Sequence, residues 1–122
     1  MKPDAPPSSR IAPLAAQLPA GKLKRFTGTA RDDAGLRNVD VAVTAGRGKA
    51  CRRLAKDGTL KPGDCTKPVW LRAKGTSKWR FVLKKPLPKG RYVVRSRATD
   101  GAGHRERRFT AARGNRRAFR LL

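Results

Sequence analysis

The chain has few of the residues from which catalytic and metal sites are built. Its 122 residues include 8 Asp plus Glu, one histidine and two cysteines. A structural zinc site takes about four nitrogen or sulfur ligands, and the two thiols and His104 do not supply them. Glu106, the one glutamate, and His104 stand in no motif that places a nucleophile beside a base. We therefore expect no metal, no cofactor and no catalysis.

Long apolar runs are also missing. No stretch approaches about 20 consecutive apolar residues, the length that a membrane-spanning helix needs. Residues 1–9 lack the apolar core of a signal peptide, and their proline and serine content predicts a linker within a longer protein. A chain of this length fits a single domain, which we place at residues 10–122.

Positive charge dominates what is present. Lys plus Arg number 31 against 8 Asp plus Glu, so the formal net charge is +23. Such an excess attracts polyanions over a distance. Nucleic acid, acidic lipid, wall polymers and acidic polysaccharide all respond to it, so the charge alone names no partner.

The two cysteines, Cys51 and Cys65, flank a segment that contains glycine and proline. In a small β-domain this arrangement predicts a disulfide, which forms in an oxidising compartment and places the protein outside the cell or in the cell envelope. Closing a loop of this length is worth about 3 kcal/mol in the chain-entropy model. Two free buried thiols are the alternative.

Alternation of apolar and polar residues indicates β-strands. In Arg25–Arg31 and Asn38–Ala45 every second residue is apolar or small, and the turn residues between them predict that these two segments form a hairpin. The pattern continues in Lys78–Lys84, Arg91–Thr99, Arg107–Ala111 and Arg117–Leu121. Turn residues recur roughly every 8–12 residues. We predict an all-β, immunoglobulin-like antiparallel β-sandwich of about seven to nine short strands.

One stretch carries a family resemblance. Residues 87–103, LPKGRYVVRSRATDGAG, resemble the LPxGxYxVxxRAxDxAG corner motif of bacterial extracellular immunoglobulin-like and fibronectin-III-like modules. With the cysteine pair and Trp79, the chain is similar to modules of secreted multidomain proteins of actinobacteria over roughly residues 24–104. The resemblance implies the fold and an extracellular setting, but fold alone does not define function. At the corner, Gly90 permits a tight turn, and Tyr92 can bury its ring while its hydroxyl bonds to backbone.

Cations follow the polar faces of two predicted strands and a later segment. If the two strands belong to different sheets, their cations lie on opposite outer surfaces of the sandwich. Solubility alone also requires charge on such faces, so a solvated surface is the alternative. We hypothesise that the cations bind anionic wall polymer or polysaccharide; they are Arg91, Arg95 and Arg97, Lys78, Arg80 and Lys84, and Arg105, Arg107 and Arg108.

Other candidate residues have structural interpretations. Asp32, Asp33 and Asp100 fall in two turns that can meet at one end of a sandwich, but the arginines around them disfavour calcium, so we expect them to stabilise the turns. His104 stands where the motif has asparagine and is interpreted as a turn residue. Trp70 either packs beneath the disulfide loop, which we expect, or stays exposed to stack on carbohydrate.

The sequence thus predicts a non-catalytic extracellular module that spaces, presents or attaches neighbouring domains of a longer chain. Weak electrostatic affinity for the cell envelope accompanies that role. The alternative is a basic nucleic-acid-binding β-domain of the cytoplasm, such as an OB-fold barrel. Aromatic residues are few, and no RRM, KH, helix-turn-helix or zinc-finger pattern is present, so we do not expect nucleic acid as the partner.

Overall fold

The computed structural model describes residues 6–47 and 50–122, and these residues form β-strands and connecting loops without helix. They contain no helix long and apolar enough to cross a membrane. The smaller sheet has four strands in the order β1 (Ser8–Ile11), β3 (Arg25–Arg31), β9 (Lys78–Val82) and β8 (Lys74–Gly75). The larger sheet has the order β2 (Gln17–Leu18), β11 (Arg116–Leu121), β10 (Gly90–Asp100), β4 (Leu36–Arg47), β5 (Ala50–Leu54) and β6 (Leu60–Gly63), with β7 (Leu71–Arg72) also paired to β4.

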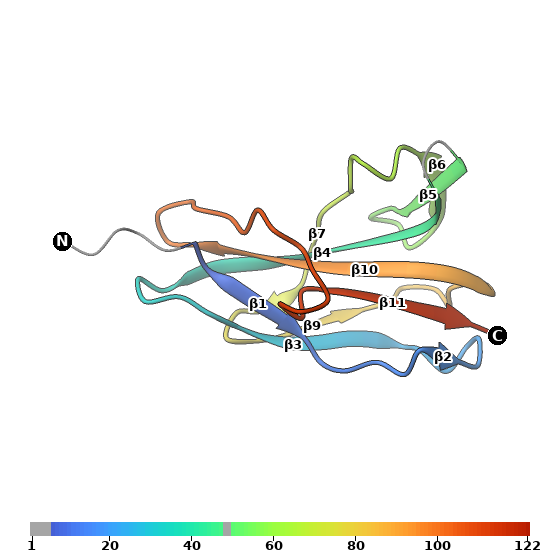
Figure 1. The fold of residues 1–122 in the computed structure, drawn as a ribbon, viewed down its shortest axis with the longest axis horizontal. Helices are drawn as coiled ribbons and strands as arrows, with labels where there is room; N and C mark the ends of the chain where they lie inside the picture. Colours follow the sequence, from blue (N-terminus) through green and yellow to red (C-terminus); the bar gives the residue numbers. More distant parts are fainter. Residues whose placement is uncertain (1–5, 48–49) are drawn as a thin grey trace.

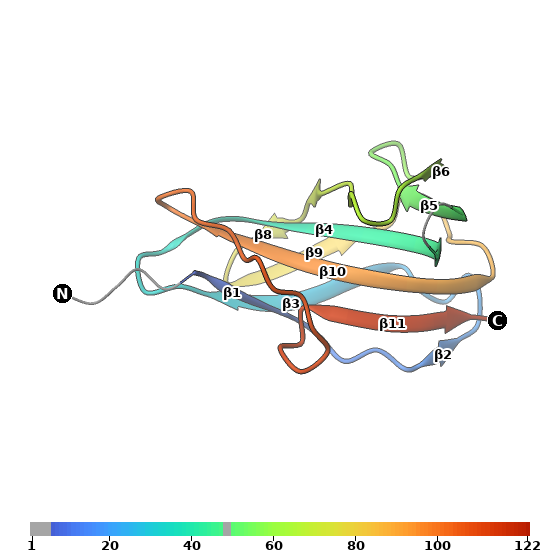
Figure 2. The same cartoon turned by 45° about the horizontal axis from the view of Figure 1, so that its top comes forward.

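The two sheets pack face to face in an immunoglobulin-like β-sandwich, as the alternation predicts (Figures 1 and 2). The smaller sheet corresponds to strands A, B, E and D of that fold, and β4, β10 and β11 correspond to C, F and G. The pairings are antiparallel except for β2, which runs parallel to β11. Several of these pairings, such as β4 with β10 and β3 with β9, join segments that are distant in sequence.

Inward-facing side chains of both sheets make one hydrophobic core. Phe119 of β11 lies between Phe26 of β3 and Tyr92 of β10, with ring centroids 5.8 and 5.4 Å away. The remaining core positions follow the period of two, and the fully buried valines of the long strands are Val39, Val41, Val43 and Val94. Burying the inner faces of both sheets in this way supplies the main driving force for the fold.

The predicted hairpin between Arg25–Arg31 and Asn38–Ala45 is wrong. β3 pairs with β1 and β9 in the smaller sheet, whereas β4 pairs with β10 and β5 in the larger one. The turn between β3 and β4, in which Gly35 has a φ of +90°, carries the chain from one sheet to the other. Both strands bury one face against the shared core, so alternation alone does not distinguish a hairpin from a crossing between sheets.

Other element boundaries also differ from expectation. Residues 107–111 are not a strand but part of an irregular loop between β10 and β11. The strands number eleven in the described residues, more than expected, and β2, β7 and β8 have two residues each. β7 lies within a strand that alternation predicts over residues 69–73. Ser8 and Ser9, which were assigned to a linker of residues 1–9, belong to β1. Residues 1–5 of that linker lie outside the described residues.

The corner before β10 has the expected tyrosine contact. The Tyr92 hydroxyl donates a hydrogen bond to the Pro88 carbonyl at 2.6 Å, and the ring is buried in the core. Gly90 has a φ of +150°, which L side chains rarely adopt. Trp79 is buried on β9 and donates its indole N–H to the Thr29 carbonyl at 3.1 Å. Tyr92 and Trp79 thus belong to the core, and Gly90 allows the backbone turn into β10.

Cys51 and Cys65 form the predicted disulfide, with Cα atoms 5.5 Å apart. Cys51 lies on the same side of β5 as Arg53, which pairs with Thr44 on the outer face of the larger sheet. Asp40, Ala42 and Thr44 all point to that outer face, yet all are buried. Residues 64–70, which we call the strap, pass over this face between β6 and β7 (Figure 1).

Reduction of the disulfide should destabilise the fold without dismantling it. The bond restricts a loop with a sequence separation of 14 in the unfolded chain. We expect the Cys51→Ser/Cys65→Ser variant to lose about 3 kcal/mol of unfolding free energy. Urea denaturation at neutral pH measures the loss, and an unchanged midpoint would contradict it. Titration of the unreduced wild-type protein should detect no reactive thiol.

Candidate functional site

The outer surface of the smaller sheet is basic and open to solvent. Register pairing places residues of four strands on this surface, opposite the core side chains Phe26, Ala30 and Trp79. All of its side chains are exposed, six are cations and none is a carboxylate. We call it the basic face; its members are Ser8, Arg10, Arg25, Thr27, Thr29, Arg31, Lys74, Lys78, Arg80 and Val82.

The nine cations singled out from sequence fall in separate places. Lys78 and Arg80 belong to the basic face, whereas Lys84, beyond the end of β9, donates its ammonium to the Lys56 carbonyl at 2.8 Å. Arg91, Arg95 and Arg97 lie on the outer face of the larger sheet, as expected for a strand in the other layer. The remaining three, Arg105, Arg107 and Arg108, are exposed on the loop between β10 and β11.

Arg97 is not a free surface cation. Its guanidinium lies 4.3 Å from the centroid of the Trp70 ring, which in turn packs against Phe109 at 5.3 Å. A guanidinium stacked on an indole is held by cation–π attraction. One nitrogen also approaches Asp40 at 3.8 Å, and Asp40 accepts a second cation, Arg72, at 3.0 Å. Trp70 therefore packs against Arg97 and Phe109, whereas the sequence predicts packing beneath the disulfide loop.

The guanidinium groups of Arg95 and Arg97 are partly withdrawn from water. Burial lowers the pKa of both, and the neighbouring charges of Arg116 and Arg105 lower it further, while Asp40 partly offsets the effect at Arg97. Three guanidinium nitrogens on this covered face, in Arg53, Arg95 and Arg97, are buried without a hydrogen-bond partner. The strap therefore withdraws Arg95 and Arg97 from the open surface, whereas Arg91 of the same hypothesised polyanion-binding set stays exposed.

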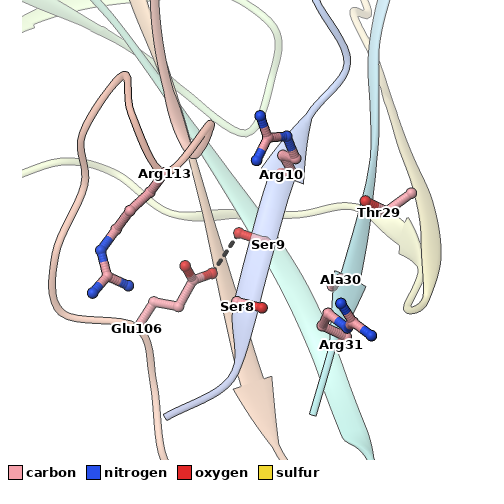
Figure 3. A pocket seen from close by; sticks show the side chains of 8 residues that line it. All are labelled: Ser8, Ser9, Arg10, Thr29, Ala30, Arg31, Glu106 and Arg113. Carbon is pink, nitrogen blue, oxygen red and sulfur yellow. Dashed lines mark hydrogen bonds between the residues drawn. The ribbon is translucent and has the colours of Figure 1, made fainter.

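A buried polar network fastens the loop between β10 and β11. Glu106 is 5% exposed and points from the loop toward Ser9 on β1 (Figure 3). One carboxylate oxygen, Oε1, accepts hydrogen bonds from the Ser9 hydroxyl and from the Ala98 amide, the latter at 2.8 Å. The other, Oε2, accepts from Asn115 Nδ2 at 2.8 Å. Since the Ser9 hydrogen is engaged, Ser96 donates to Ser9 across 2.7 Å.

Asn115 completes this network and is fully buried. Its side-chain nitrogen also donates to the Arg108 carbonyl at 2.7 Å, and its oxygen accepts from the Thr110 amide at 2.9 Å. It thereby satisfies loop backbone that has no strand partner. Gly114-Asn115 is a favoured hairpin-turn pair, so the sequence predicts a turn at Asn115 and not its burial. Glu106 is considered in the sequence only as a carboxylate without a catalytic motif. The sequence contains one indication of a structural role for Glu106, which is that the single glutamate of the chain is flanked by arginines.

A surface cavity of about 510 Å³ opens beside this network. Figure 3 displays its lining: β1 and β3 form one side, and Glu106 and Arg113 of the loop form the other. The carboxylate and the Ser9 hydroxyl, which would be the chemical groups of such a site, are both held within the network. The arrangement is that of a structural tie between β1 and the loop.

Two of the three turn aspartates, Asp32 and Asp100, stabilise their own turns. Asp32 accepts from the Ala34 amide at 2.9 Å, and Asp100 accepts from the amides of Ala102 and His104 at 3.0 and 2.8 Å. The two turns meet, since Gly101 donates to the Gly35 carbonyl. Among the residues that the structure describes, no three His, Cys, Asp or Glu side chains form a possible metal site.

His104 contributes to the same turn through its ring, with Nδ1 3.0 Å from Asp100 Oδ2. Burial raises the pKa of Asp100, but hydrogen bonds from the His104 amide and ring outweigh it, so the pKa lies below its ordinary value. A depressed carboxyl pKa stabilises the fold above the unfolded-state value and loses that effect as pH falls through the folded-state value.

We expect Asp100→Asn to lower the melting temperature at pH 7, with the difference from the wild type shrinking in acid as the wild-type carboxyl becomes protonated. Asparagine retains an acceptor for the two amides but presents an amino group toward His104. Melting curves of both proteins across this pH range test the point. A difference independent of pH would show that the charge of Asp100 does not matter.

Glu106→Gln should destabilise the protein although the side chain keeps its size. Both carboxylate oxygens accept hydrogen bonds, so the glutamine amino group must face a donor in either orientation. We expect a loss of about 1–3 kcal/mol, the usual cost of a buried unsatisfied group. Arg107→Gln, at the exposed neighbouring position, is the control in urea denaturation and should be nearly neutral. Equal urea midpoints for the two variants would show that Glu106 does not connect β1 to the loop in a way that stabilises the fold.

No protein-family model matches the chain, and no curated protein is similar to it in sequence. The fold and the geometry of its surfaces are therefore the basis for any functional conclusion.

Proposed function

We propose that this chain is a non-catalytic, immunoglobulin-like module of an exported protein that binds anionic polymers of the cell envelope through the basic face. The observation that carries the proposal is the composition of that face, on which six exposed cations stand without a carboxylate. Uncompensated cations on one surface create a positive potential that concentrates anionic ligands. The disulfide supports an extracellular or envelope setting.

The shape of the face favours a polymer over a small anion. Adjacent strands lie about 4.8 Å apart, and residues on one face of a strand recur roughly every 6.8 Å, so the cations form a shallow array and not a cage. Threonine hydroxyls of β3, at Thr27 and Thr29, lie among them and can donate to anionic oxygens. An array of this kind suits repeated phosphate, sulfate or carboxylate groups.

The nucleic-acid alternative has less support. Single-stranded binders stack bases on exposed aromatic rings, whereas the basic face has no aromatic member. Trp70 and Phe109, outside that face, are packed together with Arg97. The two-layer sandwich also differs from the OB-fold barrel considered at first. A catalytic role is not favoured because Glu106, Ser9 and His104 are each engaged in structural hydrogen bonds.

Neutralising cations of the basic face should weaken polyanion binding. We expect Arg25→Gln/Lys78→Gln/Arg80→Gln to bind heparin or purified anionic wall polymer on the order of tenfold more weakly at low salt. The side chains of these three residues form no hydrogen bond or ion pair with the other described residues, so the fold should be retained. Calorimetry or a resin eluted with a salt gradient measures the change, and wild-type affinity should fall steeply as salt is added.

A matched control separates the face from net charge. Lys89→Gln/Arg107→Gln/Arg120→Gln removes the same number of exposed cations from loops and from the larger sheet. It should bind almost as the wild type does. If both triple variants weaken equally, binding depends on total charge and the basic face is not a site. Binding that ignores salt would refute the electrostatic mechanism.

A further inference from the structure

A second surface site lies at the edge where the two sheets part, beside β8. β8 has two residues, and its ladder reaches only Trp79 and Arg80 of β9. The last residues of β9, Phe81 and Val82, therefore extend beyond β8 along this edge. On the other side of the opening stand the end of the strap and β7. The result is a cavity of about 660 Å³, which we call the edge groove.

The floor of the edge groove is apolar although it meets solvent. Phe81 points inward with the core positions of β9 but is only half buried. Val82 is 56% exposed, one of two large apolar side chains in the described residues that are so exposed. Trp70 and Leu71, both half buried, form the opposite wall. Water-exposed apolar surface gathered in a concave site is what a ligand with an apolar body would cover.

The rim of the groove carries charge of one sign. Its lining contains no carboxylate, and its cations are Lys56, Arg72, Lys74, Arg80 and Lys84. Arg72 is also paired with Asp40, outside the lining, at 3.0 Å. Another is fixed in place, since the Lys84 ammonium donates to the Lys56 carbonyl at 2.8 Å. A cavity of this volume falls in the usual range for small-molecule sites, roughly 300–1,000 Å³.

We propose that the edge groove binds an anionic amphiphile, a molecule with an alkyl chain and one phosphate or carboxylate group. The chain would cover Phe81, Val82 and Trp70, and the anionic group would meet the rim cations. The charge complementarity of the rim selects an anion over a neutral amphiphile, and the apolar floor selects a chain over a bare anion. The edge groove shares Lys74, Arg80 and Val82 with the border of the basic face, but its apolar floor and the other rim cations lie outside that face, so amphiphile binding does not require polymer binding.

Four probes test both halves of the recognition. Dodecyl phosphate and laurate, below their micelle concentrations, should each bind saturably with one molecule per chain in calorimetry, and they distinguish the two headgroups. Dodecyl maltoside keeps the chain without charge, and butyl phosphate keeps the charge with little chain; both should bind at least about tenfold more weakly. Fluorescence of Trp70 should change with the same saturation.

A single substitution tests the location. Val82→Asp removes apolar contact and places a carboxylate in the groove at an exposed position, so the fold should survive. It should weaken dodecyl phosphate binding about tenfold or more. Leu122→Asp, a change of the same kind at the other exposed position, should leave binding unchanged. Val82→Ser shortens the apolar contact without adding charge to the basic face, so it should still weaken dodecyl phosphate binding but leave heparin binding unchanged. Equal loss of both would assign the effect to the basic face.

Defined outcomes would overturn the proposal. Equal binding by the two aspartate variants would place the amphiphile elsewhere, and equal affinity for dodecyl maltoside would remove the role of the rim cations. If sedimentation shows a dimer that Val82→Asp dissociates, and neither dodecyl phosphate nor laurate binds, the groove is an interface between two copies.

Discussion

The scarcity of carboxylates is the constraint from which much of this structure follows. With 31 cations and 8 acidic residues, ion pairing can neutralise only a fraction of the positive charge. Several acidic residues stabilise the fold through hydrogen bonds and ion pairs. Asp40 pairs with two arginines, Asp100 and Asp64 accept hydrogen bonds within turns, and Glu106 connects the last loop to β1. Most cations are left to the surface, where solvent screens them. The charge of the surfaces is thus a consequence of where the acids are used.

The fold shows what residue patterns reveal and what they do not. The period of two correctly placed the buried side of Arg25–Arg31 and the inward position of Tyr92, because burial acts on each strand by itself. Strand pairing depends on partners distant in sequence. Alternation therefore predicts a hairpin around Gly35, whereas the turn joins two sheets. Two-residue strands such as β8 are too short to carry a pattern.

The candidate sites were predictable to a lesser extent. Alternation identified Lys78 and Arg80 as outward-facing, but the full basic face needs the register of β1, β3, β8 and β9. Arg97 has the same alternation, but its guanidinium is covered because the strap, tied to β5 by the Cys51–Cys65 disulfide, brings Trp70 over it. The edge groove depends on where β8 stops. Features made by one strand were visible in the sequence; features made by several elements were not.

The positions of β1 and β11 have a mechanical consequence. β1 begins at one end of the long axis, and β11 finishes at the other (Figure 1). A pull along that axis would act parallel to the strands and shear the ladder between β1 and β3, whose hydrogen bonds run across the direction of force. The Ser9 contact with Glu106 and the bonds that Ile11 makes with Gly114 and Arg117 would resist the same displacement. A domain held in this way can bear tension along its long axis before its sheets separate.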